Sequence, residues 1–292
     1  MSPNFNKGLL LTSLGSFWWG FIGVIYFEYV SFIGHVELVV HRCLWTAVML
    51  LITTTAFSKW KIFFKEIKDK KKLIALFISG LLIFINWSIW IYAVASERII
   101  DASFGYFIMP IISVMLGYIF FKEELNKKRF FSIFLVLISI IILIFFNLKS
   151  LPWVGLIVAF SWAFYNLVRK KIEIDTDIGL LIESLYIFPF ALFVFYIISQ
   201  NGFNDFNLSN PGLSIFLILA GPMTVIPLFL YVRGVEIIGL GPTGMIFYIT
   251  PTLQFILGYF YYGEDFSLVK FVSFIFIWIA VVIYMNDLYE KN

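Results

Sequence analysis

Charged side chains are scarce in this sequence, and that scarcity excludes a soluble protein. Of the 292 residues, 13% are charged and 61% are hydrophobic, and the mean hydropathy is +0.96. Soluble domains carry about 25% charged residues and about 45–50% apolar residues. A fold of this length cannot hide so much apolar surface, so lipid must cover part of it. The composition therefore predicts an integral membrane protein, with the lipid bilayer as its first partner.

Cysteine and histidine are almost absent, which removes most metal and redox chemistry. Cys43 is the single cysteine, so no disulfide can form within the chain, and His35 and His41 are the two histidines. Two isolated histidines and one cysteine do not make a zinc cluster. We expect no metal and no cofactor, and we expect no nucleic-acid partner.

Catalytic patterns are also missing. The acidic residues fall mostly outside the apolar runs, and no Ser-His-Asp arrangement or carboxylate cluster is visible. We therefore expect no enzymatic activity, and a membrane-embedded enzyme acting on a lipid or small molecule is the weaker alternative. A channel is weaker still, because no ring of like charges or filter-like loop is present.

Long apolar runs are what the sequence has in abundance. A membrane-spanning helix needs about 20 mostly apolar residues. The first run is longer than a signal-peptide core and lacks a small-residue cleavage site after it, so we interpret it as a membrane helix. The sequence predicts an all-α membrane protein with ten spanning helices, at about 7–29, 36–57, 73–96, 100–121, 130–147, 152–169, 178–199, 212–233, 239–262 and 268–286.

Lysine and arginine predict the orientation of these helices. The connection after the second helix, 58–72, holds seven lysines, and basic residues recur after the fourth and sixth helices. Basic residues accumulate in cytoplasmic connections. We therefore expect the even-numbered connections and both termini to be cytoplasmic.

A repeat relates the two halves of the chain. At an offset of 141, helix 103–124 aligns with 244–265. Near the start of each half, 16–21 aligns with 159–164 at an offset of 143, which pairs Trp19 with Trp162. Five helices separate the copies, and an odd number inverts the topology, which is the signature of an inverted-repeat transporter. We expect one five-helix repeat in 1–147 and a second in 152–292. The matched positions are Pro110 with Pro251, Gly117-Tyr118 with Gly258-Tyr259, and Glu123-Glu124 with Glu264-Asp265.

Six stretches together resemble the drug/metabolite transporter superfamily, in its EamA-like, RarD-type branch. The resemblance runs over essentially the whole chain and implies two inverted repeats, alternating access, a bacterial inner membrane and cytoplasmic termini. It implies a small-molecule substrate without naming it. The stretches are "HRCLW" (41–45), "INWSIWIYAV" (85–94), "ASFGYFIMP" (102–110), "AFSWAFYNLVRKK" (159–171), "LLIES" (180–184) and "YITPTLQFILGYFYYGE" (248–264).

Arg42 stands next to His41 inside an apolar run. A charge near the centre of a spanning helix costs about 2.5–3.5 kcal/mol on insertion scales, so such residues usually face the protein interior and mark a pathway. Arg42 lies roughly 9 Å along its helix from the outer end. We expect it at the outer end of a translocation cavity; a side chain that extends to the outer headgroups is the alternative.

The 141 offset aligns Arg42 with Glu183, near the opposite face of the membrane. The two lie roughly 14 Å apart along the membrane normal, too far for a direct pair. We expect each to have a local partner, Glu28 for Arg42 and Arg169 for Glu183. These hairpin pairs are either structural or gates at the two ends of the cavity. As gates, Arg42 and His41 would meet an anionic or carbonyl group, and Glu183 would meet a cationic group or a proton.

Further polar or aromatic side chains are candidates for substrate contact or for hydrogen bonds between helices. A small amphiphilic metabolite fits an aromatic cavity, and an amino acid or other zwitterion fits Arg42 with Glu183. Proton coupling, exchange and a homodimer all stay open. The candidates are Trp19, Asn86, Trp87, Tyr106, Tyr165, Tyr248 and Gln254, and the expected mid-helix kinks are at Pro110, Pro227 and Pro251.

Overall fold

The computed structural model describes residues 3–95, 99–147, 153–202, 204–207, 209–261, 263 and 267–291. All regular structure in these ranges is helical. The first half holds α1 (Pro3–Phe17), the π-helical turn η1 (Trp18–Ile22), α2 (Gly23–Tyr29), α3 (His35–Ala56), α4 (Trp60–Glu66), α5 (Lys70–Ala95), α6 (Ile99–Phe121) and α7 (Lys127–Asn147). The second half holds α8 (Trp153–Lys171), α9 (Thr176–Gln200), α10 (Pro211–Ile238), α11 (Leu240–Ile246), α12 (Ile249–Phe260) and α13 (Leu268–Lys291).

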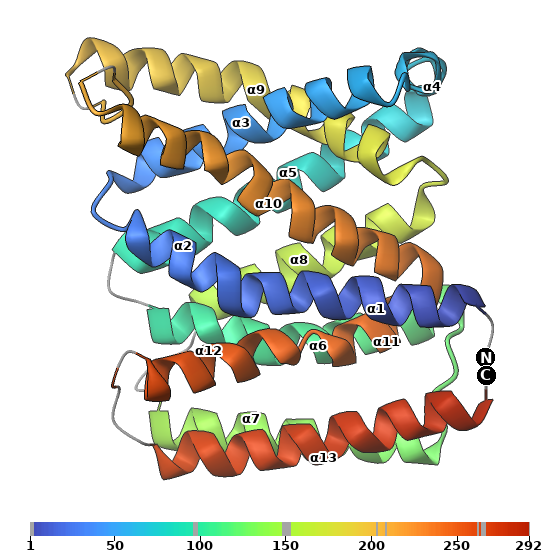
Figure 1. The fold of residues 1–292 in the computed structure, drawn as a ribbon. Coiled ribbons are helices and arrows are strands. Elements are labelled where there is room, and N and C mark those ends of the chain that lie inside the picture. The colour runs from blue at the N-terminus through green and yellow to red at the C-terminus, as the bar shows by residue number, and fades with distance from the viewer. Residues whose placement is uncertain are drawn as a thin grey trace.

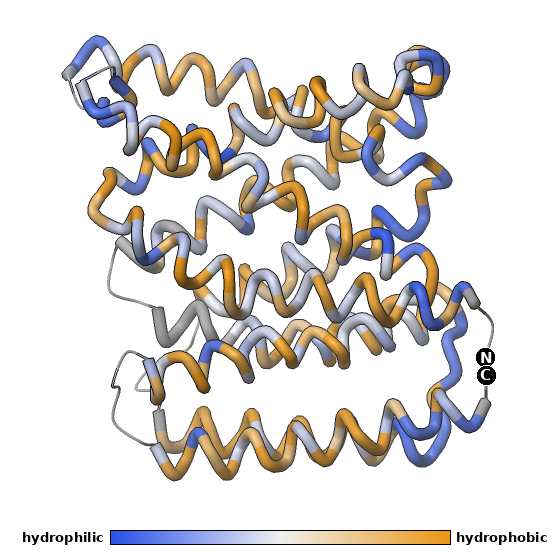
Figure 2. Tube along the Cα trace, viewed as in Figure 1, coloured by the Kyte–Doolittle hydropathy of each residue, from blue (hydrophilic) through white to orange (hydrophobic). Residues whose placement is uncertain are grey.

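The helices run side by side across one bundle, and both termini lie at the same end of it (Figure 1). In the described ranges, seven helical stretches are long and apolar enough to cross a membrane. Their outer surface is apolar along its length and hydrophilic residues gather at the two ends (Figure 2). Phe145 is 83% exposed and Phe260 is 79% exposed, as expected for side chains that face lipid. The protein is thus an all-helical, multi-pass membrane protein.

The expected apolar segments coincide with helices to within a few residues, with one exception. The expected helix 239–262 is interrupted at Phe247 and Tyr248, so that α11 and α12 follow one another as two short helices. Pro251 therefore lies in the first turn of α12, where its missing N–H leaves no intrahelical bond unmade. The interruption lies three and four residues before Pro251, where a proline removes a backbone hydrogen bond and its ring disturbs a helix. Pro110 and Pro227 lie inside α6 and α10.

Contacts between the halves come in matching pairs. The helices α3 and α9 pack together, as do α7 and α13, and α6 and α11. The packing of α5 on α8 has its counterpart in that of α10 on α1, and the packing of α3 on α10 in that of α9 on α5. Tyr248 Oη donates to the carbonyl of Phe107 over 2.8 Å, so two residues 141 apart meet directly. Glu264 and Asp265, which the repeat aligned with Glu123 and Glu124, lie outside the described residues.

Candidate functional site

A cavity of about 340 Å³ lies between the helices. Its lining runs from Ser31, in the connection between α2 and α3, to Trp19 and Trp162 deeper in the bundle. Figure 1 places the α2–α3 connection at the end opposite the termini, so the cavity extends toward that end. The whole lining is Trp19, Gly23, Val24, Phe27, Glu28, Ser31, Arg42, Asn86, Trp87, Trp90, Tyr106, Trp162, Phe247, Thr250 and Gln254.

Arg42 is the cation of this cavity. Its Nε donates to Thr224 Oγ1 over 2.9 Å, and the side chain is 7% exposed. The guanidinium carbon lies 4.5 Å from the centroid of the Trp87 ring and 5.2 Å from that of Phe27. Aromatic faces attract cations, more strongly where water is excluded. These contacts hold the charge in place with neutral groups, so the positive charge remains available to a ligand.

The expected pair between Glu28 and Arg42 does not form. Both residues line the cavity, yet no ion pair joins them in the described part of the chain. Arg42 instead bonds Thr224 of α10, which comes close only in the folded bundle. The cavity therefore presents a cation and a carboxylate separately.

His41 faces away from the cavity. Its Nε2 lies 3.4 Å from Glu37 Oε1, and its Nδ1 accepts from Trp45 Nε1 over 3.1 Å. Neighbouring residues on a helix point about 100° apart, and here Arg42 points into the cavity while His41 points toward Glu37 and Trp45. The structure separates the two members of the "HR" motif, and His41 packs against Phe206.

An aromatic cluster closes the cavity at its inner end. Trp19 meets Trp162 edge to face at a centroid distance of 5.1 Å, and Tyr231 lies 5.6 Å from the Trp162 ring. Phe247 lies 5.6 Å from Tyr231 and 5.7 Å from Tyr106. Trp19 belongs to the π-helical turn η1, and such turns are frequent at functional sites. We call Trp19, Tyr106, Trp162, Tyr231 and Phe247 the aromatic floor.

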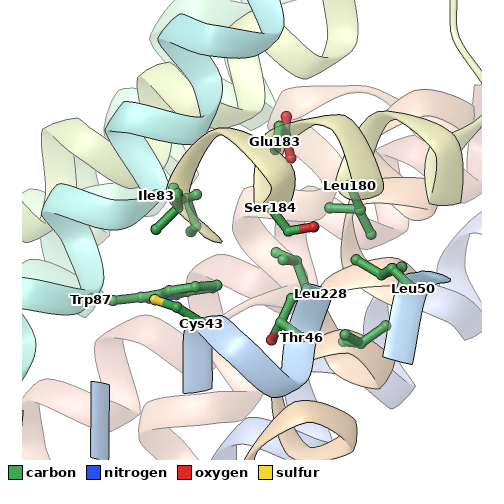
Figure 3. A pocket seen from close by; sticks show the side chains of 11 residues that line it. Cys43, Thr46, Leu50, Ile83, Trp87, Leu180, Glu183, Ser184 and Leu228 are labelled. Atoms are coloured by element: carbon green, nitrogen blue, oxygen red, sulfur yellow. The ribbon is translucent and has the colours of Figure 1, made fainter. Parts of the chain in front are cut away.

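A second and much smaller cavity, of about 20 Å³, also lies against Trp87. It is lined mainly by apolar side chains of α3, α5, α9 and α10, and Trp87 lines both cavities. Glu183 lies at its edge, with the carboxyl group directed away from Trp87 and Cys43 (Figure 3). Glu183 and Arg42 thus do not share a cavity.

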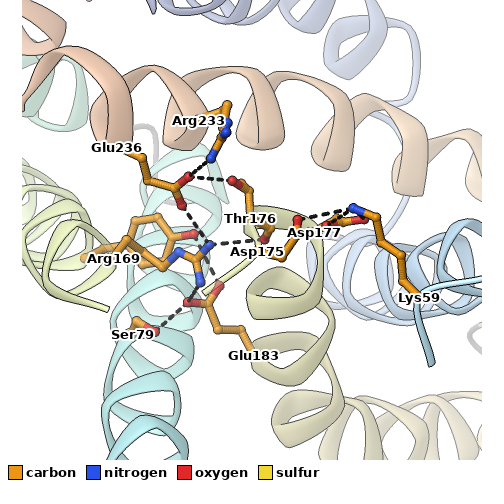
Figure 4. Close-up of polar contacts among 10 residues, drawn as sticks. Lys59, Ser79, Arg169, Asp175, Thr176, Asp177, Glu183, Arg233 and Glu236 are labelled. Atoms are coloured by element: carbon orange, nitrogen blue, oxygen red, sulfur yellow. Dashed lines mark hydrogen bonds and ion pairs between the residues drawn. The ribbon is translucent and has the colours of Figure 1, made fainter. Parts of the chain in front are cut away.

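Glu183 and Arg169 meet in a buried polar network at the end of the bundle that carries the termini (Figure 4). Arg169 Nη1 lies 3.5 Å from Glu183 Oε1, and Arg169 Nη2 lies 3.5 Å from Glu236 Oε1. Arg169 is fully buried, and Glu183 also accepts from Ser79 Oγ over 2.5 Å and from Tyr165 Oη over 3.3 Å. The structure therefore brings Arg169, Glu183 and Tyr165 together, as the chain order suggested for the first two.

Further contacts extend this network toward the bundle surface. Glu236 accepts from Thr176 Oγ1 over 2.6 Å and from Arg233 Nη1 over 3.0 Å. Lys170 Nζ donates to the Glu236 carbonyl over 2.9 Å. Glu123 accepts from the backbone N–H groups of Leu240 and Gly241, over 2.7 and 2.8 Å. We call Arg169, Glu183, Glu236, Lys170, Thr176 and Glu123 the polar layer.

The remaining candidates divide between the cavity and the helix interfaces. Gln254 lines the cavity. Asn86 lines it too, but its Nδ2 donates to Val158 O over 2.9 Å and to Ser161 Oγ over 3.0 Å, which joins α5 to α8. Tyr248 is buried at the interface with α6. Sequence reasoning missed Trp90, Thr224, Tyr231, Glu236 and Phe247; the repeat aligns Tyr231 with Trp90 and Phe247 with Tyr106, which could have identified three of them.

An all-helical membrane bundle that surrounds a cavity with one buried cation has the architecture of a membrane transporter. The model of the EamA-like transporter family matches residues 6–145 and again 150–286. The chain therefore belongs to the EamA-like transporter family, a family of transporters and not of enzymes. Two matches in one chain indicate duplicated halves.

Curated relatives cover nearly the whole chain. Protein RarD of Escherichia coli (strain K12) is 32% identical over 281 residues, which are 96% of this chain and 94% of that protein. An uncharacterized transporter of Vibrio cholerae is 33% identical over 96% of this chain and 92% of its own length. The uncharacterized transporter YojE of Bacillus subtilis is 32% identical over 95% and 93%.

A solved crystal structure has a similar fold. It superposes with a TM-score of 0.71 and covers 94% of this chain and 96% of its own, at 12% sequence identity. At that identity the likeness concerns the fold alone.

Proposed function

We propose that this protein moves a small amphiphilic solute across a bacterial inner membrane by alternating access, and that Arg42 binds the anionic group of the solute. The observation that carries the proposal is that Arg42, in an aromatic cavity closed at one end, has no carboxylate partner among the residues that the structure describes. Guanidinium binds carboxylates with two parallel hydrogen bonds. Aromatic walls such as Trp87, Trp90 and Tyr106 suit the apolar part of such a solute.

Two inverted five-helix repeats with ten spanning helices support alternating access. The matched contacts of α3 with α9, α6 with α11 and α7 with α13 are those expected when a two-fold axis in the membrane plane relates the halves. When the two halves exchange their packing arrangements, the protein changes between an outward-open and an inward-open state. The boundaries of the two repeats are 1–147 and 152–292.

The open end of the cavity faces outward in this proposal. The lysine-rich connection 58–72 and both termini lie at the opposite end, and basic connections stay in the cytoplasm. The aromatic floor and the polar layer then close the cytoplasmic side, so the structure corresponds to an outward-open state. Reporter fusions at Asn292 and within 58–72 test this orientation, and an outside signal from either would contradict it.

The cavity suits a zwitterion such as an amino acid, because Glu28 offers a carboxylate beside Arg42. This differs from the expectation that Glu183 takes the cationic group, since Glu183 is engaged by Arg169 outside the cavity. The proposal is compatible with facilitated transport, proton-coupled transport and exchange. It requires no cofactor.

The test uses purified protein and a panel of amino acids, their N-acetylated forms and small amphiphilic carboxylates. Ligands that raise the Tm of the wild type are then measured by counterflow in proteoliposomes. Arg42→Ala should lower affinity about 10–100-fold, because a charged hydrogen bond contributes about 1.5–3 kcal/mol and each 1.4 kcal/mol is tenfold. Arg42→Lys should also impair binding, since lysine lacks the planar fork. Wild-type counterflow by Arg42→Ala would contradict the proposal.

A further inference from the structure

Asn166 is buried in the middle of α8 without a hydrogen bond. The side chain is 1% exposed, and neither its Nδ2 nor its Oδ1 has a partner in the described part of the chain. An amide can make four hydrogen bonds, and burying it without any is unfavourable. Buried polar groups are normally paired, so an unpaired one calls for an explanation.

The position of Asn166 on α8 supplies that explanation. Residues four apart share one face of a helix, so Trp162, Asn166 and Lys170 form one stripe. Trp162 belongs to the aromatic floor, and Lys170 belongs to the polar layer through the Glu236 carbonyl. Asn166 therefore lies between the floor of the open cavity and the layer that closes the cytoplasmic end.

The repeat gives the same placement independently. Trp19 aligns with Trp162, and the residue one turn further along is Gly23 in the first half and Asn166 in the second. Both Trp19 and Gly23 line the open cavity, and so does Arg42, whose counterpart is Glu183. Exchange of the two halves between states would place Trp162, Asn166 and Glu183 in the corresponding cavity on the other side.

We propose that Asn166 and Glu183 line an inward-open cavity that is closed in this structure, and that the Asn166 amide binds solute or water there. The inference rests on the alternating access proposed above. Opening requires that Arg169 separate from Glu183, which frees the carboxylate for the cavity. The inner cavity then presents the Asn166 amide and the Glu183 carboxylate, whereas the outer cavity presents the Arg42 cation. The anionic group of the solute is therefore bound favourably in the outer cavity and less favourably in the inner one.

Cysteine labelling with a membrane-impermeant maleimide tests the placement without a known solute. Asn166→Cys in a Cys43→Ala background should react from the face that carries the termini and not from the opposite face. Val24→Cys, in the open cavity, should react from the opposite face. Ser139→Cys is the matched buried control, because Ser139 is likewise buried, with a hydroxyl that has no partner in the described residues, but lies on α7, away from the path. It should react from neither face.

Weakening the polar layer separates this inference from the proposed function. Glu183→Gln removes one of the two carboxylates that hold Arg169, and should raise Asn166→Cys labelling several-fold while lowering that of Val24→Cys. A fall at Val24 without labelling at Asn166 would overturn the inference and leave alternating access standing. No change at either position would overturn both.

Thermal stability provides a second readout. Asn166→Leu replaces an unpaired amide with an apolar side chain of similar size, so it should raise the Tm of the outward-open state by about 2–4 °C. Asn86→Leu is the matched control and should lower the Tm, because the Asn86 amide donates two hydrogen bonds to α8. A lower Tm for Asn166→Leu would show that the amide is satisfied where it is, and would overturn the inference.

Discussion

The two ends of the bundle each contain a buried arginine, and the groups that contact it differ between the ends. Arg42, near the open end, is held by a threonine hydroxyl and two aromatic rings and has no acidic partner in the described residues. Arg169, near the closed end, has two carboxylates and a backbone carbonyl around it. One arginine is prepared for a ligand, and the other is already neutralised.

That difference indicates different roles for the two arginines, one at the closed end and one at the open end. A buried pair stabilises little relative to apolar residues, but removing one partner is costly because a charge is left unpaired. Arg169 therefore matters most for keeping the closed end shut, whereas we expect Arg42 to matter most for what enters the open end. The same kind of substitution should therefore have different effects at the two ends of the bundle.

Arg169→Ala should have the largest effect on stability. It leaves Glu183 and Glu236 buried without their cation, and removing one partner of a buried pair costs about 3–5 kcal/mol. Arg42→Ala should cost less, about 1–2 kcal/mol, because it leaves no described carboxylate unpaired and loses one hydrogen bond and two cation–π contacts. Thermal unfolding of the two variants in the same detergent measures the contrast.

A double variant sharpens this result. Glu183→Gln in the Arg169→Ala background removes one of the unpaired charges and should recover part of the lost stability. Equal melting temperatures for Arg169→Ala and Arg42→Ala would show that the two arginines do not differ in the way described.

Glu123→Gln should have an intermediate effect, also at the closed end. The carboxylate accepts two backbone N–H groups at the start of α11, directly after Gly239. Gly239 has a φ of 95°, and a side chain there would meet the Glu123 carboxylate. Glutamine keeps one acceptor oxygen and loses the charge, so one N–H is left unpaired.

Hydrogen bonds to charged groups contribute about 1.5–3 kcal/mol, and we expect Glu123→Gln to cost about 1–2 kcal/mol of unfolding free energy. The measurement is the same thermal unfolding series. A variant as stable as the wild type would mean that the start of α11 does not depend on this contact.

The comparison also shows what the sequence could and could not predict. The length of the apolar runs predicted the helices, and chain proximity on one hairpin predicted that Arg169 meets Glu183. The same logic failed for Glu28 and Arg42. It assumed that equivalent positions have equivalent partners. In this structure one end is open and the other is closed, and a sequence repeat does not specify the conformational state.

Contacts between helices that are distant in the sequence could not be predicted either. The Arg42–Thr224 hydrogen bond joins residues 182 apart, and no local spacing signals it. Pro251 indicated a disturbance in this helix, but Phe247 and Tyr248 are apolar enough to continue it, so its division into α11 and α12 was not predicted. Their contacts with Tyr106 and Phe107 arise only once the two halves pack.

The smallest effect on stability should come from Glu28→Gln, at the open end. Glu28 lines the cavity, is exposed, and forms no ion pair in the described part of the chain, so we expect the free energy of unfolding to stay within about 0.5 kcal/mol of the wild type. Its effect should instead be on ligand choice. If Glu28 receives the cationic group of a zwitterion, the variant should lose affinity for amino acids but keep its affinity for their N-acetylated forms, which lack that charge. Thermal-shift titrations with matched pairs of the two compounds measure this, with Arg42→Ala expected to weaken both members of each pair. An unchanged preference in Glu28→Gln would remove the carboxylate from recognition and leave Arg42 as the charged group that selects the solute.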